Sequence, residues 1–221
     1  MVDIAKSAYL SVFTVVIVAI LTVSPQTASA DDANDCIKGR GEIRLNSCSR
    51  IIETKMLFGN PISPEHLATA FMSRGNSYLE MERYDQAIND YNQAIILVPD
   101  NANFYSNRAN AYEQKNQSNR AISDYNTAIH LNPKFAIAYN NRGTVFKNQE
   151  KFESAIADFN KSISLNPGYP YVYLNRGTTY EQIGEFDKAE SDFRMAIRLN
   201  PNDEFLVKEV YESLKRIGKE P

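Results

Sequence analysis

The sequence contains no tryptophan, and it has only two cysteines and two histidines among 221 residues. His66 and His130 lie far apart and share no ligand spacing with Cys36 or Cys48, so a metal site is not supported. No glycine-rich phosphate loop is present, and no serine lies in a nucleophile elbow. We therefore expect no catalytic residues, no metal and no cofactor, which argues against an enzyme.

An excess of positive charge is also missing. Lys and Arg total 24 against 27 Asp and Glu, and the net charge is −3 with both signs interspersed. Surfaces that bind nucleic acid are normally strongly basic. The composition therefore argues against nucleic acid as a partner, and nothing in it indicates a small-molecule substrate.

Four prolines, in contrast, recur at a fixed interval of 34 residues, at Pro99, Pro133, Pro167 and Pro201. A fixed period of this length is typical of stacked supersecondary units, which present a binding surface rather than a catalytic pocket. Aligned on the prolines, the copies are Ala68–Asn101, Ala102–Phe135, Ala136–Tyr169 and Pro170–Asp203, and positions within each copy are counted here from 1 to 34.

Each copy has the pattern of a helical hairpin. Positions 4, 8 and 11 share one face of a first helix, and positions 20, 24 and 27 share one face of a second. Small residues dominate positions 8, 20 and 27, while aromatic residues occupy positions 4, 11 and 24. We interpret these aromatics as helix-packing core rather than as a ligand cage. The proline ends the second helix, because it lacks an N–H and disfavours helical geometry in the residue before it.

The length and the small–small–aromatic–proline signature resemble the tetratricopeptide repeat (TPR), from residue 68 to about residue 217. The chain departs from the family at position 4, where Phe or Tyr replaces the frequent Trp. The resemblance implies an all-α fold, a right-handed superhelix of four helical hairpins. A capping helix is predicted from Asp203 to Ile217, because an N-cap is followed there by an amphipathic stripe, and residues 204–221 comprise this helix and the tail.

Residues 1–30 have the pattern of a secretory signal peptide. A short basic region precedes the uncharged run Tyr9–Val23, and Ala28-Ser29-Ala30 forms a small-x-small cleavage pattern. We predict a cut after Ala30 and a periplasmic or secreted protein without stable membrane insertion. The alternative is a retained membrane anchor, although spanning a membrane takes about 20 apolar residues.

Residues 31–67 hold both cysteines, with eleven residues between them. An exported chain meets an oxidising compartment, so we predict a structural disulfide between Cys36 and Cys48. Cys48 lies where the aromatic of position 24 would stand, which suggests a degenerate first hairpin over residues 33–57. Residues 58–64 are then a loop. The overall pattern resembles exported TPR proteins of Gram-negative bacteria, especially alphaproteobacteria.

Two charged positions recur in all four copies. Arginine occupies position 7, and aspartate follows sixteen residues later at position 23. A row of arginines could form a phosphate-binding surface. The matched aspartates favour structural ion pairs between the two helices of each hairpin instead. The predicted pairs are Arg74–Asp90, Arg108–Asp124, Arg142–Asp158 and Arg176–Asp192.

The resemblance implies that ligands face the first helix of each hairpin, at positions 2, 5, 6, 9, 12 and 13. These positions are rich in amides and nearly uncharged, and Asn can satisfy both the donors and the acceptors of an extended peptide. The row resembles the asparagine ladder of O-linked N-acetylglucosamine transferase, and it lacks the cations of a carboxylate clamp. The alternative is that some asparagines cap turns or bond neighbouring helices. The predicted groove residues are Asn76, Asn107, Asn110, Asn140, Asn141, Thr144, Tyr171, Asn175 and Thr178.

Together these features predict a non-catalytic adaptor of the bacterial cell envelope that binds an extended peptide or a partner protein. The alternative is a structural subunit of a larger envelope complex, docking through its convex face or its N-terminal hairpin.

Overall fold

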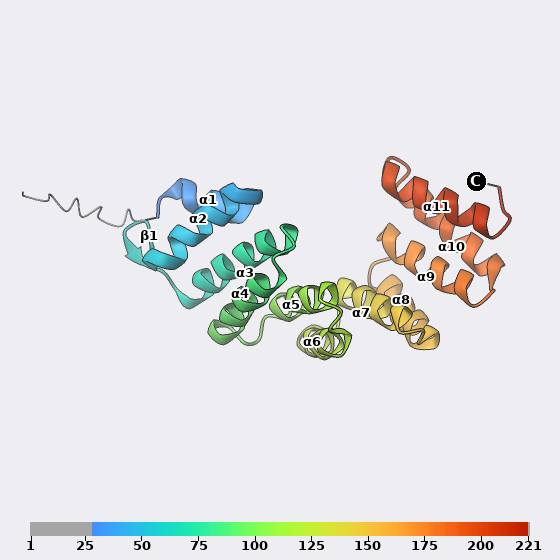
Figure 1. The fold of residues 1–221 in the computed structure, drawn as a ribbon, viewed down its shortest axis with the longest axis horizontal. Helices are drawn as coiled ribbons and strands as arrows, with labels where there is room; N and C mark the ends of the chain where they lie inside the picture. The colour runs from blue at the N-terminus through green and yellow to red at the C-terminus, as the bar shows by residue number, and fades with distance from the viewer. Residues whose placement is uncertain (1–27, 221) are drawn as a thin grey trace, which may run out of the picture.

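The computed structural model describes residues 28–220, which fold into eleven α-helices and one short β-hairpin. The helices stack in consecutive pairs along an arc whose two ends rise on the same side (Figure 1). The all-helical solenoid that the repeat predicts is therefore confirmed. The helices are α1 (Ala30–Lys38), α2 (Gly41–Thr54), α3 (Pro64–Glu80), α4 (Tyr84–Leu97), α5 (Ala102–Gln114), α6 (Ser118–Leu131), α7 (Ala136–Asn148), α8 (Phe152–Leu165), α9 (Pro170–Gln182), α10 (Phe186–Leu199) and α11 (Glu204–Arg216).

The core of each hairpin is an aromatic ring on the second helix that packs against a small residue on the first. Phe159 is fully buried, and a Cβ added to Gly143 would come within 2.7 Å of its ring. A larger residue at this position would have to push the ring aside, so the small residue sets how closely the helices approach. The same contact joins Gly75 to Tyr91 and Gly177 to Phe193.

The helices end where the sequence predicts. The second helices finish at Leu97, Leu131, Leu165 and Leu199, each two residues before the repeating proline. Within each hairpin the turn passes through one left-handed residue, with φ between 58° and 79°. Among these residues, only Gly184 adopts that conformation without a steric penalty; the other three are Glu82, Asn116 and Glu150.

The four arginines of position 7 bind both their own hairpin and the preceding one. Arg142 donates from Nε and Nη2 to Asp158, at 2.7 Å each, and from Nη1 to Asn126 Oδ1 of the preceding hairpin at 2.6 Å. Its guanidinium also lies 5.6 Å from the ring of Tyr139 and 5.7 Å from that of Phe146. Arg74, Arg108 and Arg176 repeat this arrangement with Asp90, Asp124 and Asp192. These arginine side chains are 16–20% exposed. They therefore face their aspartates rather than an anion in solvent.

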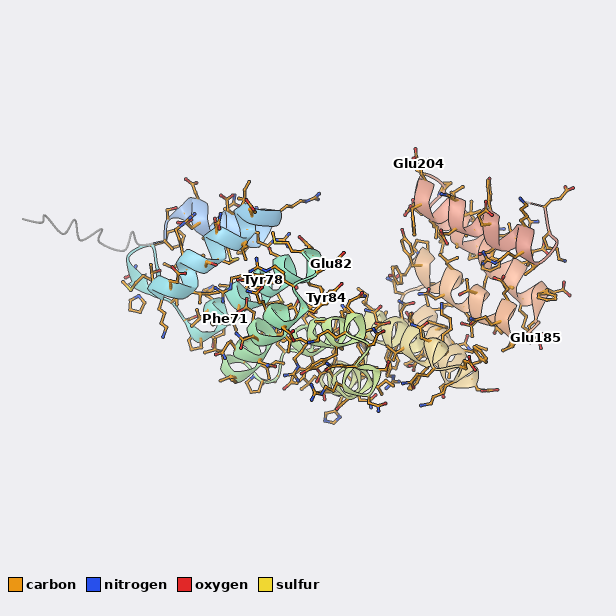
Figure 2. The ribbon with its side chains drawn as sticks, in the orientation of Figure 1. Phe71, Tyr78, Glu82, Tyr84, Glu185 and Glu204 are labelled. Carbon is orange, nitrogen blue, oxygen red and sulfur yellow. A yellow bond between two sulfur atoms is a disulfide. The ribbon has the colours of Figure 1, made fainter. Side chains whose placement is uncertain are left out.

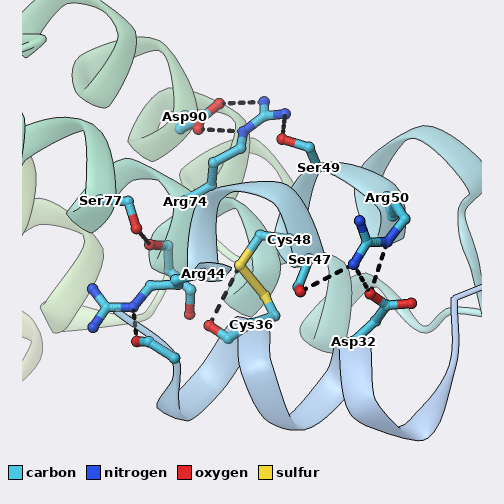
Figure 3. Close-up of a disulfide and its surroundings, with 12 residues drawn as sticks. Asp32, Cys36, Arg44, Ser47, Cys48, Ser49, Arg50, Arg74, Ser77 and Asp90 are labelled. Atoms are coloured by element: carbon cyan, nitrogen blue, oxygen red, sulfur yellow. Dashed lines mark hydrogen bonds and ion pairs between the residues drawn. A yellow bond between two sulfur atoms is a disulfide. The ribbon is translucent and has the colours of Figure 1, made fainter. Parts of the chain in front are cut away.

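Helices α1 and α2 form an extra hairpin that packs on α3 and is held by the disulfide Cys36–Cys48 (Figure 3). Arg74 Nη1 reaches back to Ser49 Oγ at 3.3 Å, just as the later arginines reach Asn92, Asn126 and Asn160. Ser49 thus occupies the place of position 25, next to Cys48 at position 24. The hairpin is therefore joined to the stack by the same contact that joins one repeat to the next.

The link from α2 to α3 is more ordered than the loop we predicted over residues 58–64. Strands β1 (Met56–Leu57) and β2 (Asn60–Pro61) pair antiparallel across a two-residue turn. Phe58 and Gly59, the turn residues, both have positive φ, as a tight hairpin turn requires. Ser63 then caps α3, which begins at Pro64.

The predicted signal peptide, residues 1–30, lies outside the described residues apart from its last three. Ala28 is buried, and its carbonyl accepts a hydrogen bond from the Phe58 N–H at 3.3 Å. Ser29 caps α1 in a reciprocal capping box with Asp32. A cut after Ala30 would therefore remove this cap, while the disulfide and the Asp32–Arg50 ion pair would remain.

At the other end of the stack, Asp203 caps α11, whose Leu206, Val210 and Leu214 are fully buried. The apolar stripe predicted for a capping helix therefore lies against the last repeat. None of the helices formed by residues 28–220 combines the length and the apolar character needed to cross a membrane.

Ser162 breaks the small apolar pattern of position 27, where the other copies have Ala94, Ala128 and Ala196. It is fully buried, and its hydroxyl has no hydrogen-bond partner among the described residues. We expect Ser162→Ala to raise the unfolding free energy by about 1 kcal/mol, because it removes an unsatisfied buried polar group. A thermal melt should show a midpoint about 2–4 °C higher.

The matched control is Ser164→Ala, two residues further along the same helix and exposed. Its midpoint should stay close to that of the wild type. A fall in the midpoint of Ser162→Ala would contradict the assignment of an unpaired hydroxyl.

Candidate binding groove

The first helices of the hairpins, α3, α5, α7 and α9, lie on the inner side of the arc (Figure 1). They frame a groove of about 560 Å³. Figure 2 shows Glu82 and Tyr84 at the turn between α3 and α4, facing the interior of the arc. The groove is lined by Leu79, Glu80, Glu82, Tyr84, Asn110, Glu113, Gln114, Asn140, Asn141, Thr144 and Asn175.

Five of the nine predicted groove residues line it, namely Asn110, Asn140, Asn141, Thr144 and Asn175. The other four do not: Asn76, Asn107, Tyr171 and Thr178. The Tyr171 hydroxyl donates to Asp203 Oδ2 at 2.7 Å, so this side chain helps to hold the start of α11 instead.

The asparagines form a ladder from one repeat to the next. Asn107 donates to Asn76 Oδ1 at 3.2 Å, Asn141 to Asn110 Oδ1 at 3.1 Å, and Asn175 to Asn140 Oδ1 at 3.0 Å. The hydroxyls of Tyr91 and Tyr125 also donate to the first two of these oxygens. The amides therefore bond neighbouring helices, which is the alternative that the sequence left open.

The ladder nevertheless leaves polar atoms for a ligand. Among residues 28–220, no protein group bonds the amide nitrogens of Asn76 and Asn110, or the amide oxygens of Asn107 and Asn175. Of these residues, Asn110 and Asn175 line the groove, and Asn76 and Asn107 continue the ladder beyond it. Donors and acceptors of this kind match the N–H and C=O groups of an extended backbone. The bonds along the ladder fix the orientation of each amide in advance.

Position 12, one of the positions that the family resemblance places on the ligand side, supplies charges to the inner face in addition to Glu80 and Glu82. Its residues are Leu79, Glu113, Lys147 and Glu181. Glu113 lines the groove and accepts a hydrogen bond from the Tyr125 hydroxyl at 3.5 Å. Lys147, on the next helix, donates to Thr178 Oγ1 at 3.4 Å. Neither residue was among the predicted groove residues, although comparing position 12 across the four copies could have identified both.

Burial raises the pKa of Glu113, although the Tyr125 hydroxyl and the positive charge of Lys147 both oppose this shift. Burial also lowers the pKa of Lys147, against the attraction of Glu113. Each side chain is half-buried, and for each the loss of solvation outweighs the compensation that its neighbours provide. Glu113 in the groove lining, and Lys147 one helical turn after the groove residue Thr144, are therefore two charges that the protein only partly stabilises.

We expect Glu113→Gln to be more stable than the wild type at about pH 7. Folding raises the pKa of Glu113 above its value of about 4.3 in the unfolded chain. The free energy of unfolding therefore falls as the pH rises from the unfolded-state pKa through the folded-state pKa, because the folded protein then has to hold a half-buried negative charge. Glutamine removes that penalty and can still accept from Tyr125. Denaturant melts at about pH 7 and about pH 4 should show a clear gain at the higher pH and little difference at the lower one. An equal stability at about pH 7 would contradict the burial penalty.

Sequence comparisons identify the repeat. A family model described as "TPR repeat" matches residues 75–116 and 110–150, and the model "Tetratricopeptide repeat" matches residues 136–169 and 170–203. These matches cover more than half of the chain. The chain therefore belongs to the tetratricopeptide repeat family. A search of curated proteins finds no match to the sequence.

Solved structures with this fold include TTC0263, a thermophilic TPR protein of Thermus thermophilus. The two are 19% identical, with a TM-score of 0.66 over 79% of this chain and 90% of that one. YrrB, described as a TPR protein with an unusual peptide-binding site, is 22% identical, with a TM-score of 0.57 over 77% of this chain and 83% of that one. The first TPR of Spaghetti (RPAP3), solved with the HSP90 peptide SRMEEVD, is 28% identical, with a TM-score of 0.52 over 54% of this chain and 95% of that one.

Proposed function

We propose that this protein is a non-catalytic adaptor that binds an extended peptide, or an extended segment of a partner protein, in the groove between α3, α5, α7 and α9. The observation that carries the proposal is the asparagine ladder. Hydrogen bonds hold its amides in place, it lies on the inner face, and within residues 28–220 it keeps free donors or acceptors on the first, second and fourth repeats.

The polar character of the groove supports this ligand class. Five of its eleven lining residues are amides and three are carboxylates, so it does not suit a compact hydrophobic molecule. A backbone that runs along the repeats can meet one amide after another. Peptide recognition by YrrB and by the first TPR of RPAP3, both of which share this fold, agrees with that use.

We further propose that the protein acts in the bacterial cell envelope after export. The leader pattern of residues 1–30 and the buried disulfide Cys36–Cys48 support this location. The disulfide would be maintained in an oxidising compartment, where it fixes α1 against α2 within the first hairpin.

A substitution that blocks the groove but keeps the hydrogen bonds between the asparagines tests the proposal. Thr144 lines the groove, and the one bond that its hydroxyl makes to residues 28–220 goes to the carbonyl of Asn140 in its own helix, at 3.2 Å. We expect Thr144→Arg to weaken partner binding by at least about tenfold, a loss of about 1.4 kcal/mol, because the long side chain fills the groove. Pull-down from an envelope extract, followed by mass spectrometry and titration of the retained partner, measures this effect.

Thr127→Arg is the matched control. The Thr127 hydroxyl makes the same kind of bond, to the Ser123 carbonyl at 3.1 Å, but it lies on the outer helix α6. This variant should keep the partner, and both variants should melt like the wild type. A partner that Thr144→Arg retains would place the interface outside the groove. That result would favour docking through the convex face or the N-terminal hairpin, as in a subunit of a larger complex.

A further inference from the structure

The last turn of each first helix carries the side chain of position 12, and these side chains form a row of Leu79, Glu113, Lys147 and Glu181. Leu79 is uncharged. Glu181 is already neutralised, because Arg216 of α11 binds both of its oxygens, at 2.7 and 3.1 Å. Glu113 and Lys147 attract each other, but they are the two members of this row that lack a close ion-pair partner among the described residues.

Neither of these two charges has an ion-pair partner within 4.0 Å among residues 28–220. Their hydrogen bonds are long and go to neutral hydroxyls, from Tyr125 at 3.5 Å and to Thr178 at 3.4 Å. The position-7 arginines differ sharply, since each makes two short bonds to a carboxylate. The position-7 arginines are thus closely paired, whereas Glu113 and Lys147 have no close partner of opposite charge. Glu82 also lines the groove without an ion pair among the described residues, but it is exposed and keeps its contact with solvent.

We propose that Glu113 and Lys147 determine specificity: the groove selects a peptide that carries a basic side chain beside Glu113 and an acidic side chain beside Lys147. This inference rests on the proposed function, and it adds the charge pattern of the ligand to it. The two residues lie one repeat apart, on α5 and α7, so the order of the two ligand charges also fixes the direction of the peptide along the ladder.

The physical reason is incomplete compensation. Half-buried charges lose solvation energy, and the neighbouring groups of Glu113 and Lys147 compensate for only part of that loss. The raised pKa of Glu113 and the lowered pKa of Lys147 both indicate this. A ligand that brings a matching charge to each restores the balance through charge-assisted hydrogen bonds. A ligand with the reverse order would place like charges together, which costs binding energy.

A peptide-display selection tests this charge order. The purified protein is offered a library of random dodecapeptides, in parallel with the charge-exchanged variant Glu113→Lys/Lys147→Glu. We expect wild-type peptides to share a basic and an acidic residue at a fixed separation, and the exchanged variant to enrich the opposite order. A synthetic consensus peptide should bind the exchanged variant at least about tenfold more weakly than the wild type.

The matched control exchanges charges elsewhere at the same one-repeat spacing. Asp100→Lys/Lys134→Glu changes two exposed residues at position 33 of consecutive copies, and it should select the same peptides as the wild type. The single variants Glu113→Gln and Lys147→Met keep the test valid if the exchanged variant fails to fold. Each should lose the preference for one charge and keep the other.

The outcomes separate the two proposals. Enriched peptides without a charge preference, or an unchanged order on the exchanged variant, would overturn this inference and leave the groove as a binding site. If no peptide is enriched at all, the proposed function is overturned, and this inference falls with it.

Discussion

The arginine of position 7 makes the contact on which the rest of the stack depends. Its two bonds to a carboxylate join the two helices of its own hairpin, as those from Arg142 to Asp158 do. A third bond, from Arg142 to Asn126 and from the other arginines to an equivalent residue, joins that hairpin to the one before it. Only a planar guanidinium can make both bonds to the carboxylate and still present a third donor at a fixed angle. Because a partly exposed pair contributes little by attraction alone, we ascribe its role to geometry: it sets the register between neighbouring hairpins. The geometry of the groove depends on this register, because its asparagines bond one another across the same interface between neighbouring hairpins.

Much of this architecture could be predicted from the sequence, because its causes are periodic. The 34-residue spacing, the small residues and the buried aromatics each recur in four copies, so one physical interpretation of a copy applies to all of them. The same alignment placed Cys48 at position 24, and the bond from Arg74 to Ser49, the next residue, agrees with that register. The short β-hairpin after α2 was missed. Its turn places Phe58 in a left-handed conformation that nothing in the local sequence would have indicated.

The groove was harder to predict, because it depends on which partner each polar atom finds. The sequence shows a row of amides. It does not show that the oxygens of Asn76 and Asn110 are already occupied by the next repeat and by a tyrosine hydroxyl. The roles of Glu113 and Lys147 could not be predicted for a related reason. They matter because neither makes an ion pair, and whether an ion pair forms depends on distances between side chains of different repeats, which the sequence does not show.

Hydrogen exchange of Arg142→Lys tests most directly the claim that this arginine couples neighbouring hairpins. Lysine keeps the charge beside Asp158 but cannot make the fork and the bond to Asn126 together. We predict faster backbone exchange in α8 and also in α6, which belongs to the preceding hairpin. Faster exchange confined to α7 and α8, with α6 unchanged, would contradict the account, because the arginine would then stabilise only its own hairpin.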